Sequence, residues 1–64
     1  MTLKEMRDKN RRAHTTISVL EFAIHALEQA SVEGGGLGVK VDKPIAMLKK
    51  EQQRMLRIYD TTKD

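Results

Sequence analysis

Apolar residues recur every three or four positions along the first half of the chain. Steps that alternate between three and four are typical of a helix that packs against another helix. Thr2 stands three residues before Glu5, the spacing of a capping box, and no Gly or Pro interrupts the chain before Gly34. We predict one long helix over residues 3–33. Its seam runs Leu3, Met6, Asn10, Ala13, Ile17, Leu20, Ile24, Leu27 and Ser31.

A shorter apolar series follows the single proline of the chain. Asp42 is a candidate N-cap, and Pro44 falls in the first helical turn, where its missing N–H costs nothing. We therefore predict a second helix over residues 43–61. Its seam runs Ile45, Leu48, Gln52, Met55 and Tyr59, and it is widened by Met47, Leu56 and Ile58.

The segment between the helices, residues 34–42, is rich in glycine. Gly34, Gly35, Gly36 and Gly38 do not have the spacing of a phosphate-binding loop, and the residue after Lys40 is not the Ser or Thr that such a loop needs. We interpret the segment as a bend. Gly34 is expected to end the first helix in the left-handed conformation that glycine adopts freely.

These elements predict an antiparallel hairpin with helices of unequal length. We expect the short helix to cover about Thr16 to Glu33 of the long one, leaving residues 3–15 as an overhang. Asn10 then has two interpretations. It either faces the Asn10 of a second copy and fixes the register of that pair, or it is exposed to solvent. If the two overhangs do not pair, we expect the overhang to be frayed until it binds a partner.

A second apolar row on the long helix predicts self-association. One short helix can shield the seam but scarcely this row as well. A chain of 64 residues without cysteine also has little means of stabilising itself alone. We predict a single all-α domain, 1–64, a helical hairpin that dimerises into a four-helix bundle. The predicted interface is Val19, Phe22, Ala23, Ala26 and Ala30.

Charge is distributed unevenly along the chain. Residues 1–16 hold five basic and two acidic residues, a net +3, residues 17–42 one basic and four acidic, a net −3, and residues 43–64 six basic and three acidic, a net +3. In a hairpin the two basic segments share the open end, which could attract an anionic partner. A solvated charged face is the alternative. The candidate contacts are Arg7, Arg11, Arg12, Arg54 and Arg57.

Residues for catalysis or metal binding are scarce. Glu21, His25 and Glu28 share one strip of the long helix, but the order His-x-x-Glu reverses the Glu-x-x-His of four-helix di-iron sites. No nucleophile has a base at helical spacing on the same face, so we expect no enzyme, no cofactor and no metal. With no cysteine, no secretory segment and no apolar run of 18 residues, we expect a cytoplasmic protein without membrane contact.

The M-T-x-x-E start, the size and the two-helix plan resemble those of small phage- and plasmid-encoded helical-hairpin regulatory proteins. The stretch DKNRR, residues 8–12, is similar to the E-R-x-R-R basic segment of basic helix-loop-helix proteins, with Asp8 in place of the base-contacting Glu. We predict a small regulatory or adaptor protein that binds another macromolecule as a homo-oligomer. Direct nucleic-acid binding through the basic end is the alternative.

Overall fold

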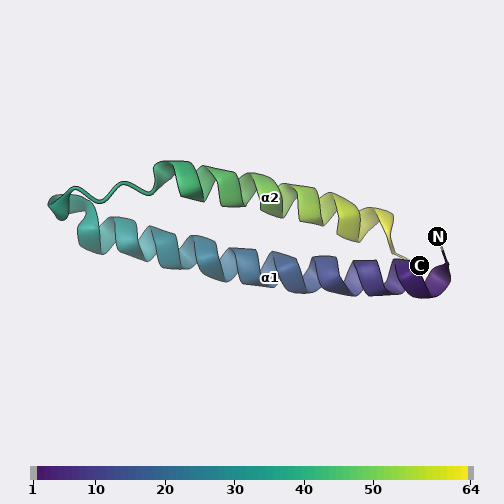
Figure 1. Cartoon of the computed structure of the whole chain (residues 1–64). Helices are drawn as coiled ribbons and strands as arrows, with labels where there is room; N and C mark the ends of the chain where they lie inside the picture. The colour runs from purple at the N-terminus through teal and green to yellow at the C-terminus, as the bar shows by residue number, and fades with distance from the viewer. Residues whose placement is uncertain (1, 64) are drawn as a thin grey trace.

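The computed structural model describes residues 2–63 and folds them into an antiparallel helical hairpin (Figure 1). Helix α1 spans Leu3–Gly34, a short 3-10 turn η1 spans Gly35–Leu37, and helix α2 spans Asp42–Thr61. The two ends of the described chain lie at the same end of the hairpin. The all-α hairpin predicted from the sequence is confirmed for this part of the chain. Met1 and Asp64, the ends of the predicted 1–64 domain, lie outside it.

The start of α1 follows the predicted capping box. The backbone N–H of Glu5 donates to the Thr2 hydroxyl oxygen at 3.2 Å, and that hydroxyl donates to the Glu5 carboxylate at 3.1 Å. Thr2 itself is extended, which is the usual backbone of an N-cap residue. The side chains of the first turn thus satisfy a backbone donor that the helix leaves unpaired.

The seam between the helices matches the heptad positions. Every member of the α1 series except Leu3 is buried or half-buried, and Ala13 and Ile24 are the most shielded, with 4% and 6% of their surface exposed. All five members of the α2 series are half-buried. The periodicity of the sequence therefore identifies correctly the face that each helix turns toward the other. Of the residues expected to widen the α2 seam, Ile58 is half-buried, whereas Met47 and Leu56 are exposed.

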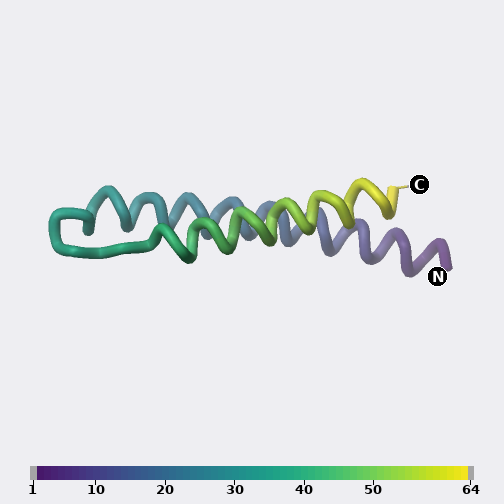
Figure 2. Tube along the Cα trace, turned by 90° about the horizontal axis from the view of Figure 1, so that it is seen from above, coloured from purple at the N-terminus to yellow at the C-terminus, as the bar shows by residue number. Residues whose placement is uncertain are grey.

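The predicted register of α2 on α1 is wrong. The Asn10 side-chain amide donates to the Tyr59 carbonyl at 2.7 Å and to the Thr62 hydroxyl at 3.1 Å, so the end of α2 lies beside Asn10. The His14 ring lies 5.6 Å from the ring of Tyr59. Figure 2 shows α2 running along the middle of α1, with the first turns of α1 projecting beyond one end of α2 and the last turns of α1, next to the loop, projecting beyond the other. Neither interpretation of Asn10 holds, because this side chain binds the C-terminus of α2.

The loop explains this shift. Residues 35–37 continue α1 as a 3-10 turn, and the chain then doubles back with the N–H of Val39 donating to the Gly34 carbonyl at 3.1 Å. The return path uses residues up to Val41, so α2 begins level with the body of α1. The N-cap of α2 is Val41, and Asp42 is the first helical residue instead of the predicted cap.

Gly34 ends the long helix for a reason that differs from the prediction. Its φ of −99° is not left-handed, and among the described residues only Gly38, with φ 85°, takes that conformation. A Cβ at Gly34 would lie 2.6 Å from Cγ2 of Val39. Gly34 is therefore needed for space, because the returning chain passes too close for any side chain.

The hairpin is elongated and has almost no core. It measures 51 × 14 × 12 Å, and its radius of gyration is 15.1 Å, against about 11 Å for a compact chain of this length. Ala13 and Ile24 are the buried apolar side chains among the described residues. The accessible surface is 5169 Å², whereas a compact protein of 7.3 kDa exposes roughly 4,200 Å². The single hairpin thus exposes roughly 1,000 Å² more than its mass requires.

Candidate functional site

The most prominent exposed feature of α1 is the second apolar row, which we call the outer row: Val19, Phe22, Ala23, Ala26 and Ala30. Val19 is 61% exposed and Phe22 is 78% exposed. Ala26 and Ala30 are also exposed, while Ala23 is half-buried. These side chains repeat every three or four residues, so they lie along one side of α1 that α2 does not cover. The interface residues predicted from the sequence thus form one continuous stripe, exposed at every position except the half-buried Ala23.

The five predicted arginines lie toward the open end of the hairpin, but they do not converge on one spot. They border three separate surface hollows. Arg7 and Arg11 line one on α1, Arg12 lines another between the helices, and Arg54 and Arg57 line a third on α2. Local ion pairs engage Arg11, which lies 2.6 Å from Asp8, and Arg54, which lies 2.7 Å from Glu51. Their arrangement is therefore a basic region spread around the open end.

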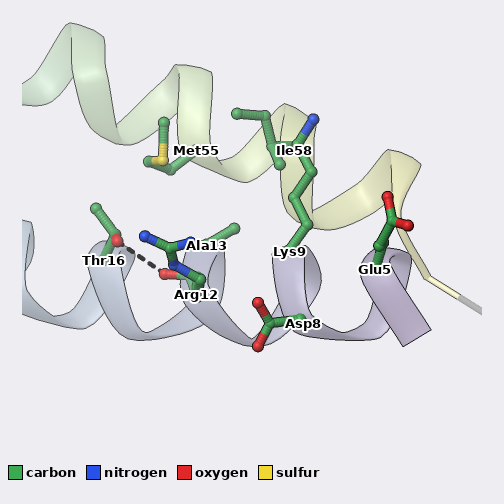
Figure 3. Close-up of a pocket in the computed structure, with 8 residues that line it drawn as sticks. All are labelled: Glu5, Asp8, Lys9, Arg12, Ala13, Thr16, Met55 and Ile58. Carbon is green, nitrogen blue, oxygen red and sulfur yellow. Dashed lines mark hydrogen bonds between the residues drawn. The ribbon is translucent and has the colours of Figure 1, made fainter. Parts of the chain in front are cut away.

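The hollow between the helices combines an apolar floor with a charged rim (Figure 3). Its volume is about 420 Å³, and Ala13, Met55 and Ile58 provide the apolar surface. Lys9 extends from α1 up to the level of Ile58 on α2. The rim carries two basic and two acidic side chains, Lys9, Arg12, Glu5 and Asp8. This balance of charge makes the hollow amphipathic and gives it no strong preference for an anion.

The hollow on α2 has the larger excess of positive charge. It is about 350 Å³ in volume, and its lining includes Lys50, Arg54 and Arg57 together with one carboxylate, that of Glu51. The sequence-based choice of contacts omitted Lys50. The signal that could have identified Lys50 is its spacing from Arg54 and Arg57. Positions i, i+4 and i+7 place three cations on one face of a helix.

The loop half of the hairpin is less acidic than segment charges suggest. Because α2 runs back along α1, its residues Lys43, Lys49 and Lys50 lie level with the acidic stretch of α1. Residues 17–51 together hold four basic and five acidic residues, a net −1, while the remaining residues of the open half hold eight basic and four acidic, a net +4. The molecule is thus basic at one end and close to neutral at the other.

The acidic and histidine strip of α1 has the geometry of ordinary surface pairs. His25 Nδ1 lies 3.6 Å from a Glu28 carboxylate oxygen, and His25 Nε2 lies 4.0 Å from that of Glu21. Within residues 2–63 no group of three or more His, Cys, Asp or Glu side chains is arranged to hold a metal ion. In the same residues, neither helix has an apolar stretch long enough to span a membrane.

Similarity to known proteins adds no evidence about function to this geometry. The chain matches no protein-family model, no curated protein and no solved structure among those compared. The features that the described residues offer are therefore the outer row, the amphipathic hollow and the basic open end.

Proposed function

We propose that this protein is a non-enzymatic binding protein that acts as a homodimer of helical hairpins and docks on another macromolecule. The observation that carries the proposal is the exposed outer row on a hairpin with only two buried apolar side chains in its described part. A chain of this size rarely reaches a stable fold on so small a core. A second copy supplies the missing burial.

The surface area agrees with this assembly. A standard protein interface removes about 800 Å² from each partner. The hairpin exposes roughly 1,000 Å² more than a compact protein of its mass. One interface of ordinary size would therefore bring the accessible surface of each chain to the value expected for its mass.

Sedimentation equilibrium over a dilution series tests the homodimer. We expect a mass of two chains at micromolar concentration, with a dissociation that Phe22→Asp shifts strongly to higher concentration, because a carboxylate in an apolar interface is costly. Val32→Asp is the matched control, since Val32 is 77% exposed but lies outside the outer row. A compact wild-type monomer at every concentration would refute the proposal.

A second candidate function is binding of nucleic acid through the basic open end. The observation that favours it is the hollow on α2 at the border of the open end, where Lys50, Arg54 and Arg57 line the surface together with a single carboxylate. Such binding would neutralise phosphates, and with one Phe, one Tyr and no Trp the chain has few aromatic residues for base stacking. It predicts an affinity that falls steeply as salt rises.

Titration with duplex DNA and duplex RNA at two salt concentrations separates the two functions. The variant Lys50→Glu/Arg54→Glu/Arg57→Glu leaves the outer row untouched, so it should lose nucleic-acid binding and keep the dimer. Binding that is insensitive to both salt and this triple reversal would exclude the nucleic-acid function. Loss of the macromolecular partner on Phe22→Asp alone would instead support docking of a protein through the homodimer.

A further inference from the structure

We propose that two copies of the chain pair through antiparallel α1 helices, with the two-fold axis between Phe22 and Ala23. This inference rests on the proposed homodimer and specifies its orientation. It follows from the order of bulky and small residues along the outer row and from the charged residues that flank this row. The side chains on one side of the proposed axis are complementary in size and in charge to those on the other side.

The size of the side chains is complementary about this axis. An antiparallel pair centred between Phe22 and Ala23 places each residue opposite the one whose number adds with its own to 45. Phe22 then lies opposite Ala23 of the second copy, and Val19 opposite Ala26. Bulky side chains meet small ones, which is how packed helices interdigitate. A parallel pair would stack Phe22 on itself and leave gaps between alanines.

The charges that flank the outer row are complementary in the same register. Arg12 lies seven residues before Val19, and Glu33 lies seven residues after Ala26, so both continue the stripe by two helical turns. The antiparallel register brings Arg12 of one copy opposite Glu33 of the other, twice per dimer. A parallel register would place Arg12 against Arg12 and Glu33 against Glu33. Electrostatics and packing thus favour the same orientation.

Neither charge has an ion-pair partner in the described part of the single hairpin. Within residues 2–63 neither Arg12 nor Glu33 forms a salt bridge, although Glu33 accepts a hydrogen bond from Gln29 at 3.1 Å. Glu33 also stands in the last turn of α1, where the helix dipole disfavours a negative charge and no basic residue is present. The Arg12 side chain of a second copy would give Glu33 an ion-pair partner and would place a positive charge near the C-terminal end of α1.

The position between these pairs is compatible with the register. Thr15 lies opposite Ala30, and both are exposed in the hairpin. The Thr15 hydroxyl donates to the Arg11 carbonyl at 3.1 Å, so it needs no partner from the second copy. From Arg12 to Glu33, every position of the stripe therefore has a suitable counterpart.

The orientation has a consequence for function. Antiparallel helices point the two open ends in opposite directions, so the basic regions lie at opposite ends of the dimer. At 1.5 Å per residue, the two Arg11 positions are separated by roughly 35 Å along the axis. The dimer would present two separate basic ends and could bridge two anionic partners.

Cysteine cross-linking tests the orientation directly, because the natural chain has no cysteine. A mixture of the variants Thr15→Cys and Ala30→Cys should form a disulfide-linked dimer under mild oxidation. Each variant alone should stay unlinked, since the two Ala30 positions are roughly 22 Å apart along the axis, and a disulfide needs Cα atoms within about 7 Å. A mixture of Thr15→Cys and Val32→Cys is the matched control.

Charge reversal supplies an independent readout. Arg12→Glu and Glu33→Arg should each raise the dimer dissociation constant about fivefold, and the double variant should restore it, as expected for two partly exposed ion pairs. Efficient linking of Ala30→Cys to itself, or no linking of the Thr15→Cys and Ala30→Cys mixture while wild type sediments as a dimer, would overturn the orientation. A wild-type monomer would overturn the homodimer itself.

Discussion

Helix α1 carries two apolar stripes that differ in what covers them. The seam residues Ala13 and Ile24 are almost completely shielded by α2, whereas Val19 and Phe22 of the outer row keep 61% and 78% of their surface exposed. Both stripes consist mainly of apolar residues at helical spacing. The difference shows that α2 covers one apolar stripe of the longer helix and leaves the other largely exposed. The seam is covered within one chain, while in the proposed homodimer the outer row would be covered by the second copy.

Truncation in the seam should have the largest effect. We expect Ile24→Ala to lower the free energy of unfolding by about 3 kcal/mol per chain, because it leaves a cavity at the most shielded large side chain of the hairpin. Urea denaturation followed by circular dichroism measures this change. The loss should be equal at low and high protein concentration when each variant is compared with wild type at that same concentration. A loss below about 1 kcal/mol would show that α1 and α2 are not closely packed at this position.

Truncation in the outer row should act on association. Phe22→Ala should raise the dimer dissociation constant by roughly 1,000-fold, since the dimer buries two copies of Phe22 and each contributes about 2 kcal/mol. Val32→Ala is a close control, with 77% exposure against 78% for Phe22. Sedimentation equilibrium of both variants gives the comparison. Equal effects at the two positions would mean that the outer row has no special role in assembly.

The polar position of the seam should give the smallest of these effects. Asn10→Ala removes two hydrogen bonds to the end of α2, those to the Tyr59 carbonyl and the Thr62 hydroxyl. We expect a loss of about 1–2 kcal/mol in the free energy of unfolding, and exchange of the last α2 amides with solvent should accelerate. In a double-mutant cycle, Asn10→Ala and Thr62→Ala should be less than additive, because both remove the same contact. Additive losses would contradict the contact.

Much of the fold was predictable because helix formation and helix faces are local properties. The spacing of Thr2 and Glu5 located the start of α1, and the recurrence of Ile17, Leu20 and Ile24 located its buried face. The outer row was also predictable, because its apolar residues recur at helical spacing and lie on a different side of the helix from the seam. The arginines were less predictable, because their distribution into three hollows depends on which face of each helix is covered.

The sequence by itself determined two helices, their approximate limits and the seam through which they meet, since these follow from propensity and from the 3.6-residue period of the helix. Only the tertiary structure decided how far α2 is shifted along α1. That shift depends on the path of the glycine-rich loop, where Val39 packs over Gly34, and on the hydrogen bond from Asn10 to the Tyr59 carbonyl near the end of α2. Both contacts join residues on different elements, and no periodicity along the chain encodes such a contact.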